Sequence, residues 1–130
     1  MGYFIEKTAK EIEYNKNGQQ NVEGALDDLY TLEIKNKTDN YTLELTDTSS
    51  VIELDSALAK TITIPLESNV NFALGTIIGI IQKGDGQVSI IGDVGVNVFT
   101  SKTLNLKQKY SVVSLLKNGA DSWYLFGDLE

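Results

Sequence analysis

Two neighbouring carboxylates are the first residues of this 130-residue chain whose types and spacing could do chemistry. Glu53 and Asp55 are two positions apart, so in a strand they share one face. A pair of carboxyl groups with unequal pKa values can hydrolyse a glycosidic bond. Such enzymes need a sizeable cleft, for which the short strands predicted here leave little room. We therefore favour a solvated strand edge and expect no enzymatic activity.

Two aspartates in glycine-containing turns are candidate calcium ligands. Asp85 and Asp93 lie in "KGDGQVSIIGDVG", which matches the repeating calcium-binding pattern of β-helices poorly and is not repeated. Ordinary turn chemistry explains both residues better. The chain has no histidine and no cysteine, and so lacks the commonest general base and the usual zinc ligands. We expect neither a metal nor another cofactor.

The aromatic residues near the C-terminus could contact a partner. In "DSWYLFGDL", Tyr124 and Phe126 alternate onto one strand face and Trp123 points to the other. An exposed aromatic strip could hold a sugar or a protein, which makes Trp123 and Tyr124 possible glycan or partner contacts. The alternative, which we favour, is that Trp123 closes the core of the last strand.

Composition argues against several kinds of partner. The chain has 42% hydrophobic residues and a net charge of −7, because 18 acidic residues face 11 basic ones. This balance is typical of a folded protein and disfavours nucleic acid as a partner. The most apolar run, at 72–82, is too short for a membrane-spanning helix, and the N-terminus lacks the pattern of a signal peptide. We therefore expect no membrane association, and we interpret the sequons at Asn36 and Asn40 as chance matches.

One segment near the N-terminus has helical periodicity. Apolar residues recur there with the spacing of one helix face, and Asn21 is a suitable N-cap. The same region also fits two heptads of a coiled coil, which is few for that assignment. Both interpretations stay open: a short helix on its own domain, or a short bundle between subunits. The residues that would serve oligomerisation or attachment are Val22, Ala25, Leu29 and Leu32.

From Tyr41 onward the hydrophobic period changes from 3.6 to 2. This change predicts an N-terminal attachment arm at 1–40 and an all-β displayed domain at 41–130. The segment 75–91 resembles a hairpin around "GDG", whose first strand is apolar on both faces and so needs a second cover. The end of the chain resembles another hairpin around "NGAD". We predict a small antiparallel β-sandwich or barrel of about eight strands.

Two features resemble bacteriophage fibre and head-decoration proteins. The segment "NVEGALDDLY" at 21–30 is similar to an Asn-Val-x-x-Ala-(Leu/Ile)-Asp-x-Leu segment found between the attachment and distal parts of many such fibres. The order of strand signals, from the strand that ends at Pro65 to the closing "WYLFGDL", is similar to the small β domains repeated at the ends of these proteins.

This resemblance implies a structural virion protein without enzymatic activity. In that family the N-terminal segment docks on the particle, and the β domain is displayed, commonly as a homotrimer. The short chain favours a capsid-bound decoration or head-fibre protein, assembled with other virion proteins in the host cytoplasm. The alternative is a tail-fibre or baseplate module that binds a host-surface glycan.

Overall fold

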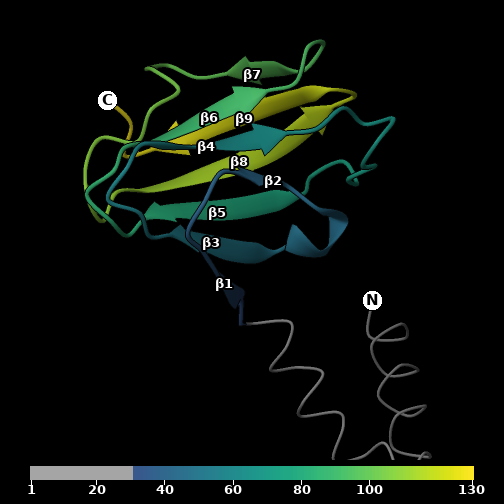
Figure 1. The fold of residues 1–130 in the computed structure, drawn as a ribbon. Coiled ribbons are helices and arrows are strands. Elements are labelled where there is room, and N and C mark those ends of the chain that lie inside the picture. Colours follow the sequence, from purple (N-terminus) through teal and green to yellow (C-terminus); the bar gives the residue numbers. More distant parts are fainter. Residues whose placement is uncertain (1–30) are drawn as a thin grey trace, which may run out of the picture. The chain divides into compact units, whose positions relative to one another are not determined.

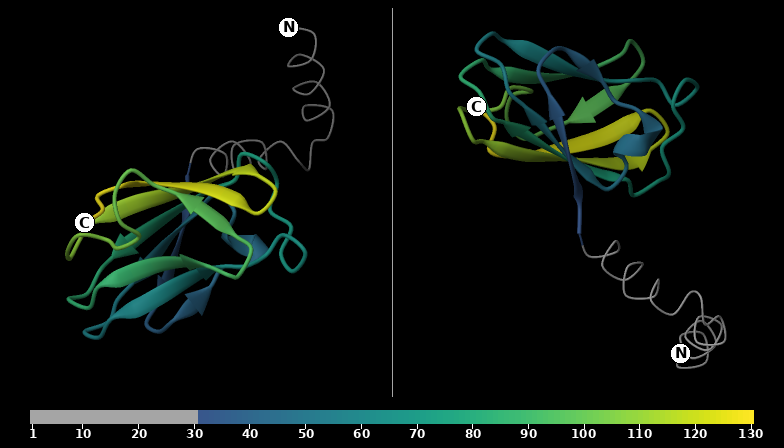
Figure 2. Two further views of the ribbon diagram at one scale, coloured as in Figure 1. Left: turned by 90° about the horizontal axis from the view of Figure 1, so that it is seen from above. Right: turned by 60° about the horizontal axis from the view of Figure 1, so that its bottom comes forward.

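Two facing β-sheets make up the described part of the chain, residues 31–130 of a computed structural model (Figures 1 and 2). These residues contain one short 3-10 helix, η2 (Leu45–Asp47), and no α-helix. The three-stranded sheet consists, in spatial order, of β2 (Tyr41–Thr42), β4 (Lys60–Ile64) and β6 (Val88–Gly92). The six-stranded sheet consists, in spatial order, of β1 (Glu33–Lys37), β3 (Ser50–Leu54), β5 (Ile77–Gln82), β8 (Val112–Gly119), β9 (Ser122–Gly127) and β7 (Asn97–Phe99).

The first six strands form a parallel β-solenoid of about three turns. The chain passes from β1 to β2, from β3 to β4 and from β5 to β6, and so changes sheet at every step. Neighbours within each sheet are parallel and in register, for example Ile52 beside Ile80 and Ile62 beside Ile90. A parallel pair needs a long crossover, and here the strand in the opposite sheet supplies it.

The predicted antiparallel sandwich or barrel is therefore wrong. The predicted hairpin at 75–91 is wrong for the same reason, because β5 and β6 lie in different sheets. The buried Gln82 amide shapes the corner between them, since its Nε2 donates to the Gly84 carbonyl at 3.2 Å and its Oε1 accepts from the Val88 amide at 3.0 Å. The Gly86 amide donates to the Ser56 carbonyl at 2.8 Å, so this corner stacks on the corner of the preceding turn.

Reversed strands close the last turn of the solenoid. The hairpin predicted around "NGAD" is confirmed as β8 and β9, and β8 pairs antiparallel with β5. In the other sheet, the Ile90 amide donates to the Leu104 carbonyl and the Leu106 amide donates to the Val88 carbonyl, at 2.8 and 2.9 Å. Both sheet edges of the last turn are thus paired, which removes them as sites of edge-to-edge aggregation.

A polar network fills the interior of the first turn. Asp47 is fully buried and accepts hydrogen bonds from Lys35 Nζ at 2.9 Å, Tyr41 Oη at 2.8 Å and the Glu44 amide at 2.7 Å. Lys35 is in register with the buried Ile52, so a cation stands where later turns place isoleucine. Because both carboxylate oxygens accept hydrogen bonds, one of them from an ammonium group, the buried charge is compensated.

Tyr41 is expected to make stability sensitive to alkaline pH. Burial, followed by its hydrogen bond to the Asp47 carboxylate, raises the pKa of Tyr41 above its ordinary value of 10.0. The unfolded chain therefore loses this proton at a lower pH than the folded chain does. The stability that protonated Tyr41 gives to the folded chain is fully present below about pH 10 and is lost as the pH rises beyond that value.

Between pH 9 and pH 11, we expect the free energy of unfolding of Tyr41→Phe to fall by about 1 kcal/mol less than that of the wild type. Urea unfolding of both chains at several pH values measures it, with the profiles aligned at pH 7. Parallel profiles for the two chains would contradict the assignment.

The core lies between the two sheets and is almost entirely aliphatic. Phe72 and Trp123 pack edge to face in it, with ring centroids 5.4 Å apart. Lys117 enters this region and donates to Glu67 Oε1 and to the Phe72 carbonyl, both at 2.6 Å. The buried hydrophobic residues are Leu43, Ile52, Leu54, Ile62, Ile64, Phe72, Ile78, Ile80, Val88, Ile90, Leu106, Val113, Leu115, Trp123, Leu125 and Leu129.

Candidate interaction surface

The outward face of the three-stranded sheet carries mainly hydroxyl side chains. Thr61 is in register with Ser89, and Thr63 is in register with Ile91. Ser89 Oγ donates to Asn105 Oδ1 at 2.7 Å. This alternation of buried isoleucine and outward threonine is the ordinary pattern of a sheet with one solvated side.

The outward face of the six-stranded sheet is different, because apolar side chains occupy it from edge to edge. The apolar residues between the buried positions are Ile34 on β1, Val51 on β3, Ile77 and Ile81 on β5, Val112 and Leu116 on β8, Tyr124 and Phe126 on β9, and Phe99 on β7. Other outward positions in the same registers hold Asn36, Glu53, Gly79 and Ser114. We call this surface the outer face. Its half-exposed members are Ile34, Ile77, Phe99, Val112, Tyr124 and Phe126.

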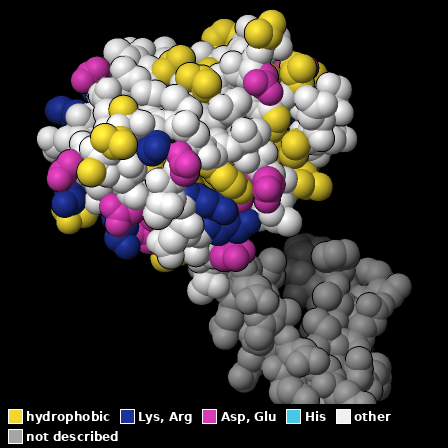
Figure 3. Space-filling view, viewed as in Figure 1, with side chains coloured by type: hydrophobic (Ala, Val, Ile, Leu, Met, Phe, Trp, Pro, Cys, Tyr) yellow, Lys and Arg dark blue, Asp and Glu magenta, His cyan; other side chains and the backbone are white. Residues whose placement is uncertain are grey.

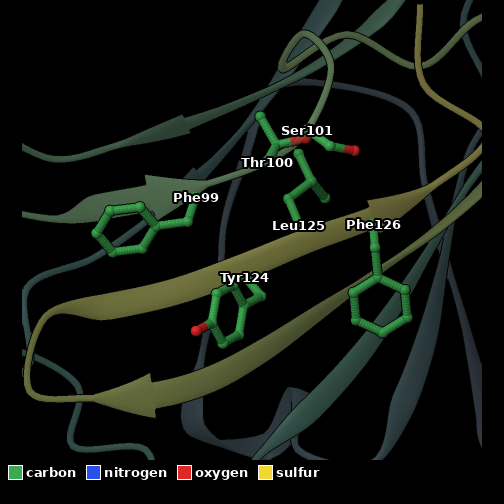
Figure 4. A pocket seen from close by; sticks show the side chains of 6 residues that line it. All are labelled: Phe99, Thr100, Ser101, Tyr124, Leu125 and Phe126. Atoms are coloured by element: carbon green, nitrogen blue, oxygen red, sulfur yellow. The ribbon is translucent and has the colours of Figure 1, made fainter.

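The aromatic end of the outer face is hollowed. Phe99 and Tyr124 are in register, with ring centroids 6.2 Å apart. Tyr124 and Phe126 project from the same side of β9, as Figure 4 shows. Together with Thr100, Ser101 and Leu125, these three aromatic residues line an open hollow of about 400 Å³ (Figure 4). Apolar walls with hydroxyl groups at the rim suit an apolar side chain or the face of a sugar ring.

The two predicted aromatic contacts lie on opposite sides of β9. Trp123 is 1% exposed and packs in the core, so it is not available to a glycan or a partner, and the favoured core interpretation is confirmed. Tyr124 is 47% exposed on the outer face. Phe99 was not among the predicted residues. Val98 and Phe99 are consecutive residues of β7, so strand alternation turns them to opposite faces, and this signal could have found Phe99.

The structure places three of the predicted carboxylates in ion pairs or in solvent. Glu53 forms an ion pair with Lys83 at 3.5 Å, and Asp55 is exposed beyond the end of β3. Asp85 is exposed in the corner after β5 and lies 3.8 Å from Lys109. Among residues 31–130, no three acidic side chains gather closely enough to hold a metal ion.

Three of the predicted attachment residues, Val22, Ala25 and Leu29, lie outside the described residues. Leu32 is described, and its side chain is exposed directly before β1. Figure 3 shows acidic, basic and hydrophobic side chains interspersed over the face of the domain that it presents. Within 31–130 the structure contains no helix long and apolar enough to cross a membrane.

Comparison with protein-family models, with curated proteins and with solved structures found no match to this chain. The described residues form a compact β domain with one mainly hydroxyl-bearing sheet face, one largely apolar sheet face and an aromatic hollow at the margin of the apolar face.

Proposed function

We propose that this protein is a non-enzymatic structural component of a bacteriophage particle. In this proposal it is a capsid-bound decoration or head-fibre protein, and residues before the β domain attach it to the particle. The working unit is a homotrimer that displays the β domain on the surface of the virion. The proposal carries over the resemblance of 21–30 and of the strand order to phage fibre and decoration proteins.

The observation that supports this proposal best is the outer face of the six-stranded sheet. A large exposed apolar surface marks a site of association, because monomeric proteins seldom expose one without a function. The hydrogen-bonded corners and the paired edges of the last turn make the domain a rigid display element. Its buried polar side chains are all hydrogen bonded within 31–130, so none is left over that would point to a bound ligand.

The aromatic hollow favours one alternative function. A tail-fibre or baseplate module that binds a host-surface glycan would use exposed aromatic rings next to hydroxyl groups, as Tyr124, Phe99 and Ser101 provide. In that case Tyr124→Ala should abolish binding to a glycan array, and Trp123→Ala should act only through stability.

Particles test the proposed function directly. Antibodies against the β domain, bound to purified phage and viewed with gold labels, are expected to decorate the head. Particles from a mutant that lacks the gene serve as the control. Labels at the tail tip would support the alternative. Protein present in the lysate but absent from purified particles would contradict both.

A further inference from the structure

We propose that the outer face is the surface through which copies of this chain pack against one another. The inference rests on the self-association in the proposed function, but not on the virion role. It assigns the hollow lined by Phe99, Tyr124 and Phe126 to the contact, where it receives apolar side chains of a neighbouring copy.

The outward faces of the two sheets differ in composition. The three-stranded sheet turns Thr61, Thr63 and Ser89 outward, with Ile91 as the apolar exception, so this chain encodes a mainly hydroxyl-bearing sheet face where one is needed. The six-stranded sheet places isoleucine, valine, leucine or aromatic residues at outward positions on every strand, and its polar exceptions include Asn36, Glu53 and Ser114. The outer face is thus not explained by a general excess of apolar residues, and a partner that removes it from water accounts for the difference.

The size of the outer face fits an association between proteins better than a small ligand. Strands are about 4.8 Å apart, so six strands span roughly 24 Å. An aromatic side chain covers about 150 to 250 Å², and isoleucine or valine less, so three aromatic and three aliphatic side chains at about half exposure offer roughly 500 Å² of apolar surface. A standard interface buries about 800 Å² on each partner, of which about 65% is apolar where copies of one chain meet. The exposed apolar area of the outer face thus matches the apolar area of one partner in a standard interface.

The net charge of the chain favours a second copy as the partner that covers the outer face. The chain carries a net charge of −7, so copies that meet through charged surfaces repel one another. The carboxylate that projects among the apolar side chains of the outer face is Glu53, and Lys83 pairs with it at 3.5 Å. A neutral apolar surface on an acidic chain lets identical copies approach without like-charge repulsion.

Light scattering of the full chain, with one charge placed on either sheet, tests the assignment. Phe126→Glu puts a carboxylate on the outer face, and Ile91→Glu puts the same group on the opposite sheet at similar exposure, 49% against 41%. We expect the wild type and Ile91→Glu to show about three times the 14.3 kDa chain mass. Phe126→Glu is expected to show the mass of one chain, with a dissociation constant at least about 30-fold higher.

The possible results separate the two proposals. A wild-type mass of one chain at every concentration would overturn both the homotrimer and this inference. Trimers in all three chains would overturn the inference alone and leave self-association to another surface, for which Leu29→Asp is the probe. Dissociation of both variants would also overturn it, because the effect would not be specific to the outer face.

Thiol labelling covers the case in which Phe126→Glu fails to fold. The chain has no cysteine, so Phe126→Cys and Ile91→Cys each introduce a unique thiol. At high protein concentration we expect a maleimide to modify residue 126 at least about 10-fold more slowly than residue 91, and the rates to converge on dilution. Equal rates at all concentrations would overturn the inference. Slow labelling that persists in the monomer would also overturn it, because the same chain would then cover its own outer face.

Discussion

Gly86→Ala is expected to lower the free energy of unfolding by about 3 kcal/mol, because the corners of the solenoid stack backbone on backbone. A Cβ atom at Gly86 would overlap the backbone of Leu58 in the preceding corner. Backbone cannot swing aside as a flexible side chain can, so the corner must move. That movement breaks the hydrogen bond from the Gly86 amide to the Ser56 carbonyl.

Urea unfolding of the full chain at one fixed protein concentration measures this effect. The fluorescence of Trp123, the only tryptophan, reports on the core. Gly119→Ala is the matched control, because an added Cβ there meets its nearest atom, Ser122 Cβ, at an ordinary 3.5 Å. We expect the control to change stability by less than about 1 kcal/mol. Similar losses in both variants would show that corner stacking is not the cause.

Asp47→Ala is expected to cost about 3 to 5 kcal/mol of unfolding free energy. The substitution leaves the Lys35 ammonium, the Tyr41 hydroxyl and the Glu44 amide without their common acceptor inside the first turn. Lys35 is only partly buried and keeps its hydrogen bond to the Thr46 carbonyl at 2.6 Å, but it loses the carboxylate that compensates its charge, and such a loss costs more than the ion pair itself contributes.

Asp39→Ala supplies the comparison for Asp47→Ala. Asp39 also forms an ion pair with a lysine, Lys60, at 2.9 Å, but its side chain is 78% exposed whereas that of Asp47 is 0% exposed. Exposed pairs contribute at most about 1 kcal/mol. Thermal and urea unfolding of both variants should therefore rank Asp47→Ala well below Asp39→Ala in stability. Equal losses would remove the Asp47 network as a determinant of the fold.

The sequence predicted where the strands lie better than how they pair. Alternating residues marked β3 and β4, and "NGAD" marked the hairpin of β8 and β9. Alternation reports which face of a strand is buried, but it is silent on which strand lies beside it. Glycines around Asp85 are equally suitable for a tight hairpin and for a corner that stacks on an earlier corner. The choice depends on Ser56 and Leu58, far away in sequence, so the local pattern could not decide it.

For the aromatic hollow, too, the sequence predicted the strand faces but not the strand pairing. The sequence placed Tyr124 and Phe126 on one face and Trp123 on the other, and this assignment depends only on the strand period. The joining of Phe99 to them depends on the parallel pairing of β7 with β9, which no local pattern encodes. The first strand of 75–91 was expected to need a cover on both faces, and Ile77 on its outward face is half exposed within the described residues.

The residue offset between the second and third solenoid turns is the same in both sheets, and this has a consequence for how the domain can be lengthened. Val51 is beside Gly79 in one sheet and Lys60 is beside Val88 in the other, so both sheets advance by the same number of residues from the second turn to the third. A duplicated copy of this turn therefore keeps both registers in step, and the closing hairpin would meet the same neighbour as before. Gene duplication, or a protein engineer, can therefore lengthen the solenoid by inserting whole turns before its closed last turn.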